Sequence, residues 1–298
     1  MSTVVQFRPH APARTTGDSR ASRTPWWLAL SVPIGLLGIA ASLTGILVDR
    51  IYRDETSNWA NQATGQDFAN LGVLAVLLVL GYSASYGSAR ALLAWAGTVV
   101  YTAYTYAIYA FAVHFGPLFL LYVAVLGLSV WALIGFFASI DPARVRAAHA
   151  DEHLTPFVAV LLIVLASGFA LLWLAQDLPA MISGTPSKEL RDTGLLTNPV
   201  HVLDLALFLP ASLVAGITLY RRLRWGHVLA PIVLTAMAGI SLGIVSLTVV
   251  SLVRDADASG PVAVVIGALG IAQAVTCWQF LRGFAPGLVR DEIMRSRR

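Results

Sequence analysis

The chain has 298 residues, of which 57% are hydrophobic and only 12% are charged, and its mean hydropathy is +0.73. This composition excludes an ordinary soluble domain, in which about 25% of the residues are charged. A single cysteine, Cys277, excludes an intramolecular disulfide and a cysteine-based metal cluster. The net charge of +4 does not indicate nucleic-acid binding, because a membrane topology explains where the basic residues lie.

Apolar runs predict an all-α membrane protein, a bundle of about eight transmembrane helices. Each run is long enough to cross a hydrocarbon core of about 30 Å, where the helix itself must pair its backbone groups. The runs divide the chain into a disordered cytoplasmic tail (1–24), a transmembrane helical domain (25–282) and a basic cytoplasmic tail (283–298). The predicted spans are Trp26–Val48, Phe68–Ser85, Leu92–Val113, Leu118–Ser139, Leu154–Ala175, Val200–Tyr220, Val228–Val253 and Val262–Leu281.

The basic residues set the orientation. With the N-terminus in the cytoplasm, the inner segments hold 15 Arg residues and the outer segments hold 5 Arg or Lys residues. The positive-inside rule therefore predicts that both termini are cytoplasmic. The outer segments are acidic, which shapes the field that a ligand would meet. Their acids are Asp49, Asp54, Glu55, Asp67, Asp177, Glu189, Asp192, Asp255 and Asp257.

The second predicted span opens with a polar pair, Asp67 and Asn70, three residues apart. An interfacial helix start is the commoner explanation of such a pair. The alternative is that both side chains belong to a ligand-binding site at the outer side of the bundle.

A stripe of hydroxyl groups follows the third predicted span and stays within about 80° on a helical wheel. The stripe consists of Thr98, Tyr101, Thr105 and Tyr109. His114 follows at its outer end. Such a stripe predicts a polar cavity that deepens from the outside, and interhelical hydrogen bonding is the alternative.

The sixth predicted span holds Asp204, the only formal charge within the eight predicted spans. Asn198 is a good N-cap, and His201 and Asp204 then share one helical face. A charge in hydrocarbon costs at least ~2.5–3.5 kcal/mol, so Asp204 is predicted to face protein, water or a ligand. A His–Asp pair could bind a proton, a cation or a polar solute, or act as a base. The structural alternative is a bond from Asp204 to a neighbouring helix.

Other polar residues give weaker signals. Gln273 is a candidate in the inner half of the last span, and Gly239 and Gly243 predict close helix packing within the bundle. His149, His153 and His227 fit solvated histidines at the cytoplasmic surface. There is no phosphate-binding glycine loop, zinc-protease motif or serine-hydrolase motif, and no lysine lies in a span, so no cofactor is predicted.

The spans also suggest a parallel 4+4 internal repeat. Spans one and five are each followed by a long outer segment, and spans four and eight both open with Gly-Pro, at Gly116 and Gly260. Four spans in each half would give both halves the same orientation, as in one class of transporters. Coincidence is the alternative, because such pairs are common at helix ends.

Two stretches resemble a known group of proteins. They are Tyr104–Leu121, which runs through Phe115-Gly116-Pro117-Leu118 towards Tyr122, and Asn198–Pro210 followed by Arg224-Trp225-Gly226. Both are similar to a family of uncharacterised bacterial polytopic integral membrane proteins, over spans two to eight. The resemblance implies the bacterial inner membrane and brings no activity.

Three functional hypotheses follow. The first is a protein that binds or transports a small polar or cationic solute through an outward-facing cavity, because the outer face is acidic and Asp204 lies in a span. The second is a membrane-embedded enzyme that uses His114, His201 and Asp204 as acid–base groups or metal ligands. The third is an accessory or sensor protein that binds a partner through the outer segments 49–67 and 176–199.

Overall fold

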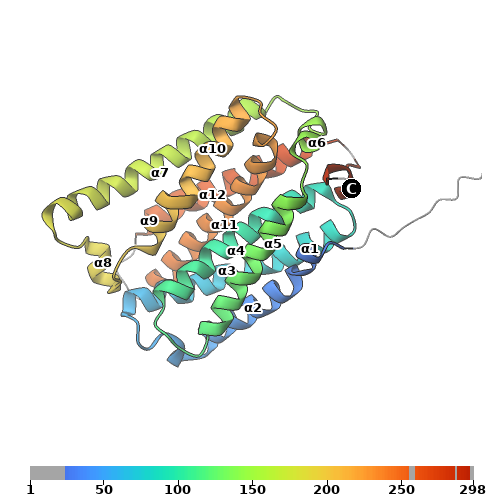
Figure 1. Ribbon diagram of the computed structural model, residues 1–298. Coiled ribbons are helices and arrows are strands. Elements are labelled where there is room, and N and C mark those ends of the chain that lie inside the picture. The colour runs from blue at the N-terminus through green and yellow to red at the C-terminus, as the bar shows by residue number, and fades with distance from the viewer. Residues whose placement is uncertain (1–23, 255–258, 286, 296–298) are drawn as a thin grey trace, which may run out of the picture.

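The structure is a computed structural model that describes residues 24–254, 259–285 and 287–295. Within these ranges the chain is a bundle with 8 helices long and apolar enough to cross a membrane, and it forms no β-strand. This confirms the predicted fold class (Figure 1). The helices are α1 (Trp26–Ala29) with α2 (Ser31–Leu47), α3 (Ser57–Ser85), α4 (Ala89–Ala112), α5 (Phe119–Ser139), α7 (Thr155–Ser183), α9 (Pro199–Leu203) with α10 (Leu209–Tyr220), α11 (Gly226–Val253) and α12 (Gly260–Arg282).

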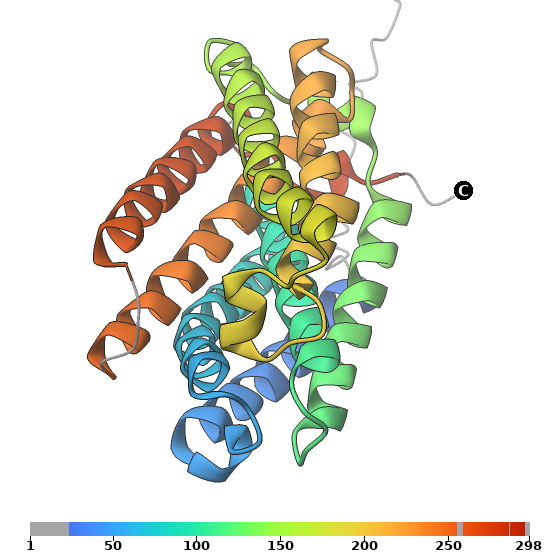
Figure 2. The ribbon, with the colours of Figure 1, turned by 90° about the vertical axis from the view of Figure 1, so that its left-hand side faces the viewer.

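The two ends of the bundle differ. The first and last described elements, α1 and η3 (Arg290–Ile293), lie at the end that also holds α6 (Pro142–Ala147), here called the proximal end (Figure 1). The opposite, distal end holds η1 (Asp49–Tyr52) and α8 (Lys188–Thr193). Figure 2 looks onto this distal end, where α8 appears below the end of α7. The predicted tail 1–24 lies outside the described residues except for its last position.

Two spans reach further towards the distal end than predicted. Helix α3 starts at Ser57 instead of Phe68, because Thr56 caps it by accepting a hydrogen bond from the Trp59 backbone N–H at 3.2 Å. Helix α7 continues to Ser183, so Asp177 lies on a helix and not in a loop. The predicted start of α3 was wrong because polar residues that face protein look like loop residues when only hydropathy is considered. The extension of α7 is mostly exposed, and its polar residues resemble a loop in the same way.

Helix α11 lies at the centre and packs against α3, α4, α10 and α12. Small residues allow this close approach, as predicted for the Gly239/Gly243 pair. A side chain at Gly239 would meet the ring of Tyr101, and one at Gly243 would meet Gln66. The pair therefore packs inside the bundle against α4 and α3.

The C-terminal segment packs on the proximal end of the bundle. The Ala285 N–H donates to the Ala148 carbonyl at 3.0 Å, and the Ala150 N–H donates to the Gly283 carbonyl at 2.9 Å. Further along, the Arg290 N–H donates to the Gly87 carbonyl at 2.6 Å, and the Arg290 side chain is buried. The described part of the predicted basic tail 283–298 thus covers the ends of the spans.

This cap encloses two histidines that the sequence had suggested were solvated. His149 is 6% exposed and His227 is fully buried, with ring centroids 5.1 Å apart. The His149 ring stacks on Phe280 at 4.5 Å, and its Nε2 lies 3.2 Å from the Phe280 carbonyl oxygen. The prediction of solvated side chains was wrong for both residues, because the returning C-terminal segment covers them.

We expect acid to loosen this cap. Burial lowers the pKa of His149, although Glu152 and Asp151 act in the opposite direction. The folded protein therefore holds the proton less tightly than the unfolded chain, and stability falls as the pH drops below the ordinary histidine pKa of about 6.5. The protection of residues 283–285 and 287–295 against hydrogen exchange, corrected for the slower intrinsic exchange of amides at lower pH, should fall between pH 7 and pH 5. A His149→Phe variant keeps the aromatic packing and should lose most of that fall in protection; an unchanged pH profile of protection would contradict the role of His149.

Candidate binding site around Asp204

The sixth span is not one regular α-helix and is interrupted at Asp204. Asn198 caps α9 by accepting hydrogen bonds from the N–H groups of Val200 at 3.0 Å and His201 at 3.3 Å. One π-helical turn, Asp204–Phe208, then joins α9 to α10, and the Leu209 N–H donates to the Asp204 carbonyl. Pro210 explains the wider turn, because a proline ring clashes with the carbonyl four residues earlier in a regular helix. Such π-turns are frequent at functional sites.

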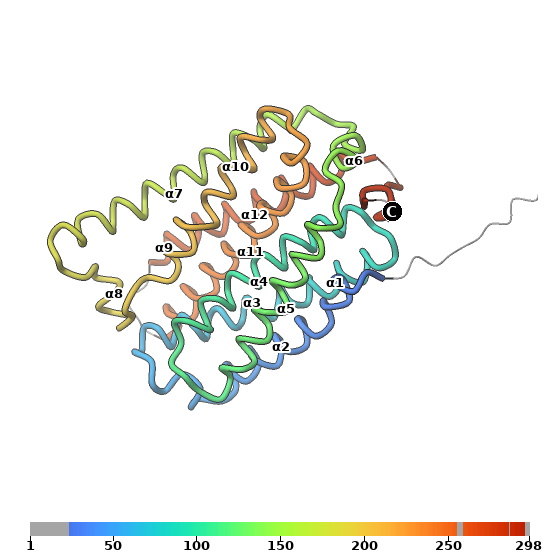
Figure 3. Tube along the Cα trace, viewed as in Figure 1, coloured from blue at the N-terminus to red at the C-terminus, as the bar shows by residue number. Residues whose placement is uncertain are grey.

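The Asp204 carboxylate faces the bundle interior and is 7% exposed. Its Oδ1 accepts a hydrogen bond from the Tyr104 hydroxyl of α4 at 3.0 Å, and its Oδ2 accepts one from the Trp173 indole N–H of α7 at 2.8 Å. Partners from two other helices therefore hold the carboxylate in place. Figure 3 shows the trace of α9 and α10 running beside α7.

His201 does not pair with Asp204 by a direct hydrogen bond. Its Nδ1 lies 2.9 Å from Asp177 Oδ1, and its ring stacks on Trp173 at a centroid distance of 4.2 Å. The expected pair is thus replaced by two linked groups, Asp177–His201 and Trp173–Asp204. With Nδ1 directed at a carboxylate, Nε2 is left buried and without a partner among the residues described.

A cavity of about 280 Å³ lies against these groups. Its walls come from α3, α4, α7, α9, α10, α11 and α12, with Glu189 of α8 at the distal side. Glu189 is exposed, so the cavity reaches the distal surface there. Among the residues that the structure describes, no Lys or Arg lines it. The aromatic lining residues are Trp59, Tyr101, Tyr104, Tyr109, Phe169, Trp173 and Phe208.

The predicted hydroxyl stripe of α4 lies largely on this cavity. Tyr101, Thr105 and Tyr109 line it, and all three are buried. Thr98 does not reach it and donates instead to the Trp95 carbonyl at 2.7 Å. The stripe also makes the interhelical hydrogen bonds that were the alternative to a polar cavity. Tyr101 of α4 donates to Asn70 Oδ1 of α3 at 2.8 Å.

Asp67 and Asn70 are not an interfacial helix start. Both lie inside α3, with 1% and 0% of their surface exposed. Asp67 accepts hydrogen bonds from the hydroxyls of Tyr52 at 2.6 Å and Tyr109 at 2.9 Å. Asp67 and Asn70 do not line the cavity but lie behind two of its tyrosines. Asp204 is therefore not the only acid within a span.

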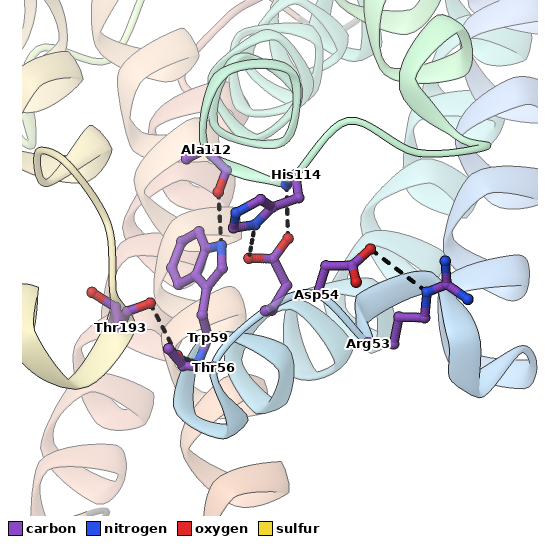
Figure 4. Close-up of polar contacts among 8 residues, drawn as sticks. Arg53, Asp54, Thr56, Trp59, Ala112, His114 and Thr193 are labelled. Atoms are coloured by element: carbon purple, nitrogen blue, oxygen red, sulfur yellow. Dashed lines mark hydrogen bonds and ion pairs between the residues drawn. The ribbon is translucent and has the colours of Figure 1, made fainter.

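His114 belongs to the distal rim (Figure 4). Its backbone N–H and its Nδ1 both bind the Glu55 carboxylate, at 2.7 and 2.9 Å, and this hydrogen bond raises the pKa of His114. Nearby, Trp59 donates to the Ala112 carbonyl at 2.9 Å, and Thr56 donates to the Thr193 carbonyl at 2.9 Å. These contacts close the rim and do not bring His114 to the cavity.

The three residues proposed for an enzyme thus do not meet. His201 and Asp204 line the cavity, whereas His114 binds Glu55 at the rim. In the described ranges no group of three or more His, Cys, Asp or Glu residues is arranged to hold a metal ion.

Sequence analysis missed Trp173 and Asp177, which hold Asp204 and His201. The two are four residues apart and therefore share one face of α7. This spacing was not recognised because the predicted fifth span ended at Ala175, before Asp177. Gln66 was also missed; it lines the cavity and donates to the Tyr101 hydroxyl oxygen at 2.6 Å. Gln273, an inner-half candidate, lines the cavity and accepts from Ser241 at 3.0 Å.

The fold defines a multi-pass membrane protein with a cavity inside its helical bundle. Comparison of the chain with protein-family models, curated proteins and solved structures finds no match.

Proposed function

We propose that this protein binds a small organic cation in the cavity at Asp204 and carries it across the membrane. The observation behind the proposal is the environment of Asp204, a buried carboxylate on a cavity whose lining includes seven Phe, Tyr or Trp side chains and, among the described residues, no Lys or Arg. Placing an acid within a span costs free energy. The presence of Asp204 there therefore favours a role for it in ligand recognition.

The walls indicate what kind of cation fits. Aromatic faces attract cations by about 0.5–2 kcal/mol each, and rings surrounding a site are the usual way to hold a quaternary ammonium group. Apolar residues such as Ile240, Ile244 and Leu247 line another part of the cavity and favour an apolar body on the ligand. A metal cation would need more oxygen ligands than Asp204 provides.

The direction of entry follows from the predicted topology. We place the termini in the cytoplasm and the distal end outside, in a bacterial inner membrane, because 15 of the 20 basic residues lie in the predicted inner segments. Glu189 lies at the distal mouth and is negative, like Asp204. It would then attract an approaching cation towards the cavity. A reporter fused after Arg298 should be cytoplasmic; a periplasmic signal would reverse this assignment.

A second candidate is a membrane-embedded enzyme that uses His201 as a base. One observation favours it: Asp177 binds Nδ1 of His201, and Nε2 is left unpartnered in a residue that lines the cavity. A carboxylate on one ring nitrogen orients the other as a proton acceptor. Product formation that requires both Asp177 and His201 would favour this reading over transport. The accessory-protein hypothesis has no comparable contact.

The proposed function is tested with two ligands of the same shape. Benzyltrimethylammonium carries a positive charge, and neopentylbenzene replaces its nitrogen with carbon. With purified protein in lipid nanodiscs, we expect the cation to bind at least about tenfold more tightly, a difference of ~1.4 kcal/mol. Quenching of the fluorescence of Trp59 and Trp173, which line the cavity, reports binding. Equal binding of the two ligands, or none of the cation, would refute the proposal.

A further inference from the structure

A second carboxylate lies inside the bundle, separated from the cavity by one tyrosine. Asp67 of α3 contacts Gly45 of α2 so closely that a side chain at Gly45 would collide with it. Its two oxygens accept hydrogen bonds from Tyr52 of η1 and Tyr109 of α4. Three elements therefore enclose a group that is 1% exposed.

The groups that face Asp67 are neutral hydroxyls. They come from η1, α4, α5 and α2, and the carboxylate makes no ion pair with a Lys, Arg or His of the described residues. An ionised carboxylate enclosed in this way has lost its hydration, and hydroxyl donors replace only part of it. A bound proton neutralises the carboxylate, so the site needs no Lys, Arg or His side chain to balance its charge. The facing side chains are Ser42, Tyr52, Tyr101, Tyr106, Tyr109 and Tyr122.

Tyr109 connects this site to the cavity. Its hydroxyl lies 2.9 Å from Asp67 Oδ1 and 3.1 Å from the Ala63 carbonyl, and both Tyr109 and Ala63 line the cavity. Its ring is held by stacking on Tyr122 at 4.9 Å. A hydroxyl can accept a proton from one side and release its own to the other. Asp67 can therefore exchange a proton with cavity water although it does not itself line the cavity.

We infer that Asp67 is a proton-binding site whose occupancy alternates with that of the cation site at Asp204. This inference rests on the proposed function and adds the coupling ion. When a cation enters, its field favours the ionised form of Asp67. The Asp67 carboxyl then passes its proton to the Tyr109 hydroxyl oxygen, and Tyr109 releases its own proton to cavity water. One positive charge enters and one leaves, so the net charge of the bundle is unchanged.

The test counts protons on ligand binding. Purified protein in weak buffer is mixed with benzyltrimethylammonium while a pH indicator and tryptophan fluorescence are read together. We expect close to one proton released per cation bound, and binding that tightens as the pH rises. Asp67→Asn should still bind the cation but release no proton and lose the pH dependence. The exposed acid variant Asp54→Asn, which lies outside the cavity, should behave as wild type.

The outcomes separate the two proposals. Absence of cation binding at every pH would refute the proposed function itself, and the coupling with it. Cation binding without proton release, or release that persists in Asp67→Asn, would overturn only the inference about Asp67. If Asp67→Asn does not fold, Tyr52→Phe serves instead. It removes one donor to the ionised carboxylate and should move proton release to higher pH; an unchanged release curve would also overturn the inference.

Discussion

Replacing Asp204 with Asn is expected to weaken the binding of benzyltrimethylammonium at least about tenfold while the protein remains folded. Two opposite charges about 4 Å apart interact by ~4 kcal/mol at an effective dielectric constant of 20, and part of this is offset by desolvation. Asn keeps the size of the side chain and one acceptor for Tyr104 or Trp173, so packing should survive. Fluorescence titration measures the affinity, and thermal unfolding measures the stability.

The controls separate charge from structure. Asp54→Asn removes an exposed acid at the distal end that does not line the cavity and should leave the affinity unchanged. Asp204→Leu removes both acceptors, leaves the half-buried Tyr104 hydroxyl without this partner, and should lower stability by about 1–3 kcal/mol as well as abolish binding. Unchanged affinity in Asp204→Asn would show that the carboxylate is only a structural acceptor.

Replacing Gly65 with Ala is expected to destabilise the bundle by about 1–3 kcal/mol, the usual cost of overpacking. A methyl group at Gly65 would collide with the backbone of Leu247 in α11, and backbone cannot rotate away as a side chain can. The contact is reinforced by Ser246, whose hydroxyl donates to the Gly65 carbonyl at 2.6 Å. Thermal unfolding in a fixed detergent measures the difference.

Gly72→Ala on the same helix is the matched control. A methyl group there meets nothing within 4 Å. Both substitutions change intrinsic helix propensity by a similar ~1 kcal/mol in favour of Ala, so the difference between them isolates packing against α11. Equal stability of the two variants would contradict the close approach of α3 and α11.

The eight spans were predictable because hydropathy over about 20 residues depends on the chain alone. The position of Asp204 was also predictable, since a capped helix start fixed how far into the span it lies. Its partners were not. Tyr104 and Trp173 reach it from other helices, and the rotation of those helices is set by tertiary packing rather than by local sequence.

The failures have a common physical origin. Asp67, Asp177 and His149 were assigned to an interface or a loop because each is polar. In the structure, Asp67 and His149 are buried among protein groups, and Asp177 binds His201. Hydropathy cannot distinguish a polar residue that faces water from one that faces protein. The parallel 4+4 repeat remains a prediction.

The most direct measurement of cation recognition is a thermodynamic cycle that removes the charge of the ligand, the charge of residue 204, or both. Affinities of benzyltrimethylammonium and neopentylbenzene are measured for the wild-type protein and for Asp204→Asn. We predict that the substitution weakens binding of the cation at least about tenfold more than binding of the neutral ligand, a coupling of ~1.4 kcal/mol. An equal loss for both ligands would contradict recognition of positive charge by Asp204.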